Sequence, residues 1–306
     1  MYLSLLPLLT PRYWLWWGTV GILWCLTRLP YPWQLAVGQQ LGRLAYWLTP
    51  RRRQIADINI KRCFPELDST QQYQLVVKHF ESLGMGLLEM LGAWWLPDTR
   101  LKPLEHIQGL EHLQAALARG KGVILVSAHF TSLEIGNRFL TRYIALHATY
   151  RRHENPLVEY VMKKNRERHA QKAIPREAVR VMLRSLKQNK VLWLATDQNF
   201  GNKQSVFANF FSIPAATNTA ISRLAKISGA AVLPCFTQRL ESLKGYQVIL
   251  QSALENFPSE DLQQDASRIN QLIERQIRCA PEQYLWVHRR FKDRPVGEQA
   301  FYAITR

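Results

Sequence analysis

The sequence is poor in cysteine and in acidic residues, and it has only one long apolar run. Its 306 residues contain no internal repeat, low-complexity tract or long linker, and a hydrophobic share of 47% with 21% charged residues excludes a disordered chain. No two cysteines form a CxxC pair, which argues against a cysteine zinc site and against a disulfide scaffold. The four are Cys25, Cys63, Cys235 and Cys279. A reduced compartment is the simplest interpretation.

Acidic residues are outnumbered by basic ones. Lys and Arg total 40 against 23 Asp and Glu, which gives a formal net charge of +17. Such a surplus predicts polyanionic partners, namely nucleic acid, anionic lipid headgroups or phosphorylated substrates. The chain has no RNP, helix-turn-helix, KH or zinc-finger signature, so we expect no nucleic-acid partner.

The first fifty residues differ from the rest of the chain. They contain six of the ten tryptophans and no acid. Residues 13–29 are apolar except for Arg28, and as a helix they would extend about 26 Å, slightly less than the roughly 30 Å hydrocarbon core of a bilayer. A signal peptide fits poorly because no small-x-small cleavage site follows, and a buried core helix is the plain alternative. We predict a hydrophobic membrane-anchor helix.

A second N-terminal segment has apolar residues at helical spacing. They are Trp33, Val37, Leu41, Leu44 and Leu48. This pattern is typical of an amphipathic helix that lies in a membrane interface. The basic triplet at residues 51–53 follows it and marks the cytoplasmic side by the positive-inside rule. We therefore expect an anchor and interfacial helix in residues 1–50 and a cytoplasmic domain in residues 51–306.

The larger domain has alternating strand and helix patterns. Strands are predicted at residues 122–128, 191–196 and 231–237, and weaker ones at 144–150 and 247–251. Helices are predicted at residues 110–118, 133–143, 156–169, 176–186, 217–227 and 262–278. Residues 69–96 look entirely helical and are expected to pack beneath the sheet. The alternation predicts an α/β fold with helices flanking a mixed, mostly parallel central sheet.

Candidate chemistry is concentrated at the end of the first strong strand. His129 follows that strand directly, and ligands of open α/β sheets lie beyond the carboxyl ends of strands. A histidine can take a proton from a hydroxyl near neutral pH, and a neighbouring carboxylate can fix its tautomer. Glu134 is the nearest candidate, although the two side chains meet only if the chain turns between them. Two plain alternatives stay open: a helix capping box formed by Thr131 and Glu134, and a purely structural role for His129.

Five sequence blocks carry a resemblance to a known family. His129-x4-Glu134 matches the HX4D/E signature of the lysophospholipid-acyltransferase superfamily. Four more blocks resemble the lipid A late (secondary) acyltransferases of Gram-negative bacteria, and they occupy residues 51–67, 150–159, 196–234 and 281–295. HX4E alone is a weak pattern, whereas five blocks in the same order are specific. The resemblance covers nearly the whole chain.

The resemblance implies a fold, a reaction and a location. The fold would be similar to that of glycerol-phosphate acyltransferases. The enzyme would move a fatty acyl group from acyl carrier protein to a hydroxyl of an acyl chain on a phosphorylated saccharolipid of the Kdo-lipid IVA type. It would work at the cytoplasmic face of the anionic bacterial inner membrane, without a metal or another cofactor.

The resemblance also implies roles for single residues. His129 would be the general base, Glu134 would orient it, and Asp197 and Arg166 would belong to the same catalytic site. Substrate-binding positions would be Arg151, Lys164, Asn199, Gly201, Ser205 and Phe207. Many relatives have an acid where this chain has Asn199, whose amide cannot serve as a carboxylate. The aromatic residues near Phe207 fit an acyl groove or an ordinary core equally.

Three further expectations concern charge and donors. The helix that begins near Thr131 offers backbone N–H groups for a developing oxyanion. The basic residues at 151–152 and 163–176 form a candidate landing surface for substrate or carrier protein, or else a solvated helix face. The triplet at residues 288–290 is a candidate for binding phosphate or carboxylate.

The alternatives to the late acyltransferase are an enzyme of the superfamily that acts on a lysophospholipid or another glycolipid, and a non-catalytic basic protein that binds membranes or nucleic acid.

Overall fold

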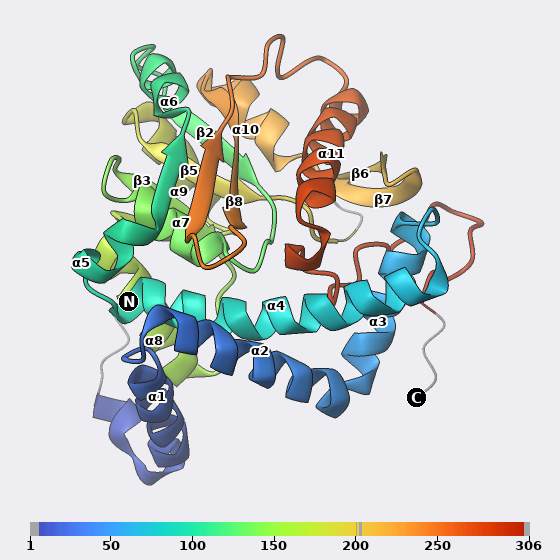
Figure 1. Ribbon diagram of the computed structural model, residues 1–306. Coiled ribbons are helices and arrows are strands. Elements are labelled where there is room, and N and C mark those ends of the chain that lie inside the picture. Colours follow the sequence, from blue (N-terminus) through green and yellow to red (C-terminus); the bar gives the residue numbers. More distant parts are fainter. Residues whose placement is uncertain (1–5, 200, 202–203, 303–306) are drawn as a thin grey trace.

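The computed structural model describes residues 6–199, 201 and 204–302. A seven-stranded sheet with the order β1-β9-β8-β2-β5-β3-β4 forms its centre (Figure 1). Every neighbouring pair is parallel except β8 and β9. The strands are β1 Glu105–Gln108, β2 Val123–Ser127, β3 Leu146–Tyr150, β4 Lys172–Pro175, β5 Val191–Ala195, β8 Ala231–Arg239 and β9 Tyr246–Leu250. The expected mixed, mostly parallel sheet is confirmed.

All five predicted strands form, and the strongest predictions fall at the centre of the sheet. All five residues of β2 are buried, because helices cover both faces of a central parallel strand. The short strands β1 and β4 were not predicted. A second, antiparallel pair was also missed, namely β6 Ser205–Phe210 and β7 Ile213–Asn218. Its two turn residues, Phe211 and Ser212, have φ of 50° and 60°, as a tight two-residue hairpin requires.

Helices flank the sheet at all the predicted places. One hydrophobic core lies between the sheet and α6, α7 and α8, and a second lies between the sheet and α9, α10 and α11. These helices are α6 Leu110–Leu117, α7 Leu133–Leu140, α8 Pro156–His169, α9 Val179–Lys187, α10 Ala220–Ser228 and α11 Leu262–Cys279. The two cores leave both faces of the sheet covered.

The long helix α4, Ser69–Trp95, runs across one end of the sheet (Figure 1). A capping box between Asp68 and Gln71 begins it. Phe80, in its first half, is part of one core, and Leu88, in its second half, is part of the other. The predicted helix beneath the sheet is thus confirmed, and it ties the two cores together.

Two shorter helices, α2 Tyr31–Leu48 and α3 Pro50–Cys63, precede α4. Glycines allow α2 to pack very closely on α4. A Cβ added to Gly42 would lie 2.1 Å from the carbonyl oxygen of Phe80, and one added to Gly84 would lie 2.0 Å from that of Gly38. The predicted amphipathic helix is confirmed as a helix, and one of its faces packs on α4. The other face exposes Trp33 and Trp47 by 65% and 69%.

The apolar N-terminal helix is shorter than the sequence predicts. Helix α1, Trp14–Leu26, has 13 residues and none of them is buried. It extends away from the body beside the start of α2 (Figure 1). In the part of the chain that the structure describes, no helix is both long and apolar enough to cross a bilayer. The expected anchor helix is therefore not supported as a membrane span.

Candidate active site

His129 and Asp197 meet at the carboxyl ends of the neighbouring strands β2 and β5. The His129 Nδ1 atom lies 2.7 Å from Oδ1 of Asp197, and the backbone N–H of His129 donates to Oδ2 at 3.0 Å. The side chain of Asp197 is 1% exposed and that of His129 is 28% exposed. No hydrogen bond to Nε2 of His129 is found among the described residues. Asp197 therefore holds His129 through Nδ1, and the other ring nitrogen, Nε2, stays accessible.

The electrostatics of the pair favour a charged imidazolium. Burial disfavours that form, but the carboxylate of Asp197 outweighs this effect and raises the pKa of His129 above its ordinary value. Burial likewise opposes the carboxylate of Asp197, yet the facing imidazolium and its hydrogen bonds hold the pKa of Asp197 well below its usual range. The guanidinium of Arg166 is near enough to lower the pKa of His129 slightly. A proton accepted by this ring would thus be stabilised.

The turn that follows His129 is fixed by the C-terminal segment of the chain. The N–H of Thr131 donates to the carbonyl of Gln283 at 2.8 Å, and the N–H of Leu285 donates to the carbonyl of His129 at 3.0 Å. Phe130 also forms an isolated antiparallel bridge with Tyr284. These bonds explain why the block at residues 281–295 belongs to the site, although it lies about 150 residues from His129 in the sequence.

A buried polar cluster fixes the same turn from the other side. Arg239 on β8 pairs with Glu89 on α4, and their side chains are 7% and 2% exposed. The hydroxyl of Thr131 lies 2.8 Å from that of Ser82, and Nη2 of Arg239 donates to it at 3.3 Å. Since a buried ion pair needs further hydrogen bonds to be tolerated, the hydroxyl groups complete this cluster. It contacts the turn but not the ring of His129.

Glu134 does not bind the ring of His129. It lies in the first turn of α7 and accepts a hydrogen bond of 2.9 Å from Nε of Arg166 on α8, with a second contact from Nη2. The prediction that Glu134 directly orients His129 is therefore wrong for this structure. The turn directs Glu134 toward α8, while Asp197 occupies Nδ1. The capping-box alternative is not found either, because Thr131 bonds Ser82 and Arg239 instead.

The backbone donors expected near Thr131 are largely used within the chain. The N–H groups of residues 129, 130, 131 and 133 all donate to other protein groups. Helix α7 begins only at Leu133, and its N-cap residue Ser132 makes no side-chain cap bond. An oxyanion at this site would therefore depend on side-chain cations more than the sequence suggests.

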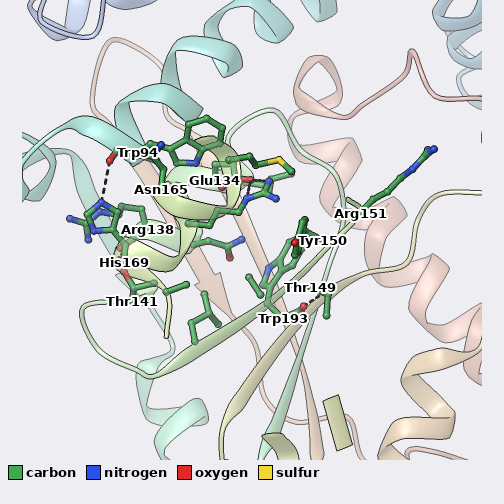
Figure 2. A pocket seen from close by; sticks show the side chains of 18 of the residues that line it. Trp94, Glu134, Arg138, Thr141, Thr149, Tyr150, Arg151, Asn165, His169 and Trp193 are labelled. Atoms are coloured by element: carbon green, nitrogen blue, oxygen red, sulfur yellow. Dashed lines mark hydrogen bonds and ion pairs between the residues drawn. The ribbon is translucent and has the colours of Figure 1, made fainter. Parts of the chain in front are cut away.

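His129 lines a cavity of about 300 Å³ beneath α7 and α8, which we call cavity A. Figure 2 shows Glu134 and Asn165 in its middle, and His169, Arg138 and Thr141 toward one end. Tyr150, Thr149 and Trp193 lie toward the other end, and Arg151 extends away from them. Much of the wall is apolar and consists of Ala93, Trp94, Leu133, Leu146, Ala148, Met162, Ala170 and Trp193.

His129 also lines a second cavity of about 290 Å³, which we call cavity B. This cavity lies on the opposite face of the sheet, against α9 and α10. Successive residues of a strand point to opposite faces of the sheet. On β5, Leu194 lines only cavity B, whereas the preceding residue, Trp193, also lines cavity A. The two cavities share His129, Thr149, Tyr150, Arg151, Trp193 and Gln198.

The structure separates the predicted substrate-binding residues. Arg151 lines both cavities beside His129. Lys164 lies on the outer side of α8 and lines a different, larger surface cavity of about 930 Å³, which we call cavity C. Asn199, Gly201, Ser205 and Phe207 line neither cavity A nor cavity B.

Asn199 has a clear structural contact. Its amide nitrogen donates to the carboxylate of Asp293 at 2.8 Å, and its backbone N–H donates to Nε2 of His288 at 3.1 Å. Burial lowers the pKa of His288 to about 4, so this ring is neutral and accepts the bond. Arg290 is 2% exposed and donates to the carbonyl of Ala216 at 2.6 Å. Within the triplet at residues 288–290, the side chains of His288 and Arg290 are therefore hydrogen-bonded to other parts of the chain.

Sequence reasoning missed three residues beside His129. Tyr150, Trp193 and Gln198 line both cavities. Tyr150 ends β3, and its hydroxyl donates to Glu159 at 2.7 Å. Gln198 follows Asp197 just beyond the end of β5. The rule that sites form at the carboxyl ends of parallel strands would have pointed to both positions.

Comparisons with known proteins agree with the resemblance seen in the sequence. The family model for bacterial lipid A biosynthesis acyltransferases matches residues 5–293. The chain is 39% identical to a lipid A biosynthesis palmitoleoyltransferase of Escherichia coli K12 over 96% of each chain. It is 38% identical to a lipid A biosynthesis lauroyltransferase of the same organism, over 96% of this chain and 97% of that one.

A solved structure gives only a weak likeness. The 1-acyl-sn-glycerophosphate acyltransferase PlsC of Thermotoga maritima matches 79% of this chain and 97% of its own at 13% identity, with a TM-score of 0.38. That score is too low to argue for a shared fold, and the family assignment stands on the sequence matches alone. The family model covers almost the whole chain, and two relatives are 39% and 38% identical to it along its length. This protein therefore belongs to the bacterial lipid A biosynthesis acyltransferases.

Proposed function

We propose that this protein transfers a fatty acyl group from acyl carrier protein to a hydroxyl of an acyl chain on a phosphorylated lipid A precursor of the Kdo-lipid IVA type. One observation carries the proposal: His129, held by buried Asp197, lies where two cavities meet, in a chain of the lipid A acyltransferase family. The relatives' names supply the lipid A acceptor and the acyl transfer. The donor and the residue roles are the proposal's own.

The chemistry follows from the two ring nitrogens of His129. The Nδ1–H donates to Asp197, which leaves Nε2 as the basic atom. Nε2 takes the proton of the acceptor hydroxyl as the oxygen attacks the thioester carbonyl of the donor. The tetrahedral intermediate then collapses, the carbon–sulfur bond breaks, and the thiolate of the carrier's prosthetic arm takes the proton back from the imidazolium. The products are an ester and a free thiol, and no charge is left over.

Arg166 is the candidate for stabilising the oxyanion. It is 19% exposed, lines cavity A, and acts electrostatically on His129. Glu134 binds Nε and one terminal nitrogen of its guanidinium, which fixes the direction in which the remaining donors point. In this proposal Glu134 serves catalysis through Arg166, whereas Asp197 serves it through His129.

The protein acts at the cytoplasmic surface of the bacterial inner membrane. Support comes from the exposed apolar residues of the N-terminal region, which include Trp14, Leu15, Ile22, Trp33, Trp47 and Leu48. Aromatic and aliphatic side chains of this kind, with Arg12, Arg28 and Arg51 close to them in the sequence, suit an anionic bilayer surface. The turn between α1 and α2 is fixed to the body through Arg100, which donates to the carbonyl of Leu29 at 2.6 Å.

The carrier protein would approach on the basic outer side of α8. Cavity C is lined there by Arg152, Lys163, Lys164 and Arg168, together with Glu159 and Glu167. Acyl carrier proteins are acidic, and complementary charge raises the rate of encounter. This surface lies next to cavity A, with which it shares Tyr150 and Asn165.

The test is an acyl-transfer assay with the purified full chain. Lauroyl-, myristoyl- and palmitoleoyl-acyl carrier protein are offered with Kdo2-lipid IVA and, separately, with a lysophospholipid, and the products are identified by mass spectrometry. The proposal expects ester formation on the lipid A precursor with at least one donor and none on the lysophospholipid. Acylation of the lysophospholipid alone, or transfer from acyl-coenzyme A but not from the carrier, would contradict it.

A further inference from the structure

The charges around His129 differ between the two sides of the sheet. In cavity A, the arginines on α7 and α8 have carboxylate partners: Arg166 pairs with Glu134, and Arg138 pairs with Asp98. In cavity B, Arg151, Arg176 and Arg223 line the wall, and no described lining residue is an acid. Arg176 contacts the neighbouring Glu177 at 3.1 Å. Positive charge is therefore largely balanced by the protein in cavity A and much less so in cavity B.

Arg223 is the clearest unbalanced cation in cavity B. It lies on α10, is exposed, and makes no ion pair with any carboxylate of the described residues. Arg151, which enters from the end of β3, has only a long contact of 3.6 Å to exposed Glu154. The amides of Gln198, Gln204 and Asn218 also line this cavity. Guanidinium groups with amide donors are the usual recognition set for phosphate oxygens.

Much of the remaining wall of cavity B is apolar, and part of it is open to the surface. Val179 on α9 is 48% exposed and Ile227 on α10 is 63% exposed, and both line the cavity. Met182 and Leu224 form its deeper, buried part. An exposed apolar rim beside unbalanced arginines fits a ligand that has both hydrocarbon and anionic groups. Such a ligand would still reach His129, which also lines this cavity.

We propose that the two substrates reach His129 from opposite faces of the sheet, and that cavity B binds a phosphate-bearing part of the acceptor lipid through Arg223 and Arg151. The acyl group of the donor then occupies cavity A, where the wall is mostly apolar and the arginines of α7 and α8 are already paired. This inference rests on the proposed function and assigns each substrate to one cavity. The phosphate bound in cavity B is that of the acceptor lipid, and the alternative source is the phosphate of the carrier's prosthetic arm.

The experiment measures steady-state kinetics of the full chain with Arg223→Gln. The acceptor is the bisphosphorylated lipid IVA precursor or the same lipid with one phosphate removed, and each substrate is varied with the other saturating. We expect the KM for the bisphosphorylated acceptor to rise about tenfold, at the low end for a charge-assisted hydrogen bond, while kcat changes less than about twofold. Arg223→Lys, which keeps the charge, should recover part of this loss. The effect of Arg223→Gln should shrink with the acceptor that lacks the phosphate bound by Arg223.

Controls make the result specific to cavity B. Arg180→Gln changes an exposed arginine of α9 that lines neither cavity, and it should leave both KM values unchanged. In cavity A, Met162→Trp should shorten the preferred acyl group without changing the acceptor KM. Thermal unfolding of every variant checks that the fold is intact.

Three outcomes would overturn the inference. The acceptor KM of Arg223→Gln could equal that of the wild type, the donor KM could rise in its place, or Met162→Trp could alter acceptor binding and leave the acyl preference unchanged. A rise in the donor KM would assign cavity B to the prosthetic arm of the carrier. A wild-type enzyme that transfers nothing to either acceptor would instead contradict the proposed function itself, so the two failures are distinguishable.

Discussion

Asp197 and Glu134 are both carboxylates near His129, but their surroundings give them different tasks. Asp197 is 1% exposed and bonds both the ring and the backbone of His129. Glu134 is 14% exposed, lines cavity A and bonds Arg166. The carboxylate nearest to the histidine in sequence is therefore not the one that sets its tautomer and pKa. In the proposed mechanism, Asp197 tunes the base and Glu134 directs a cation toward the substrate.

The largest effect is expected from removing the group that Asp197 tunes. His129→Ala should lower kcat by about 10²–10⁴-fold, the usual contribution of a general base. The variant should still bind its substrates, but its unfolding temperature should fall, because buried Asp197 loses the imidazolium that faces it. Transfer rates with saturating donor and acceptor measure this. A loss of less than fivefold would remove His129 from the chemistry.

A smaller but still large loss is expected for Asp197→Asn. The amide keeps the shape of the side chain, but it can stabilise the wrong imidazole tautomer and no longer stabilises the imidazolium, so kcat should fall by about 10²-fold. Circular dichroism and thermal unfolding serve as the fold control. An Asp197→Asn enzyme with wild-type activity would mean that the 2.7 Å bond to His129 has no role in turnover.

Glu134→Gln tests the other half of the comparison. The amide oxygen can still accept a bond from Arg166 but loses the charge, and we expect a decrease in kcat of about tenfold. Arg166→Gln should cause a similar loss, and the double variant should be little worse than either single one, because the two residues act together. Strictly multiplicative losses in the double variant would contradict this coupling.

The smallest effect is expected in the buried cluster that fixes the turn. Ser82→Ala removes the hydroxyl that lies 2.8 Å from that of Thr131, while Arg239 still reaches Thr131. The free energy of unfolding should decrease by about 1 kcal/mol, and kcat by no more than about twofold. Denaturant unfolding and the transfer assay measure the two quantities. A large loss of activity without a loss of stability would place Ser82 in the catalytic machinery.

The sequence predicts the centre of the fold better than its edges. Strands β2 and β5 are short apolar runs between turn residues, and both were predicted. Strand β4 contains Pro175 at the sheet edge, and β6 has polar residues between its apolar ones, so neither gives a strong pattern. Helix α1 was predicted too long because apolar composition indicates the environment of a segment but not the residue at which its helix ends.

The pair of His129 and Asp197 shows the same limit of local patterns. His129 was found from its position after a strand, and the family resemblance implied Asp197 and Arg166. Spacing alone pointed to Glu134, which is five residues away, whereas the actual partner of the ring is 68 residues away. The two meet because β2 and β5 are adjacent and parallel, and strand adjacency is not written in a local pattern. Likewise, no local sequence pattern indicates that α4, β8 and the C-terminal segment all contact the turn after His129.

The pH dependence of kcat/KM tests the central claim most directly. A general base must be neutral, so wild-type activity should rise with pH through the pKa of His129, which Asp197 holds above its ordinary value. In Asp197→Asn the midpoint should move to lower pH and the plateau should fall, while Glu134→Gln should lower the plateau with a much smaller shift. The same midpoint in all three enzymes, or a large shift in Glu134→Gln alone, would contradict the assignment of Asp197 as the partner of the catalytic histidine.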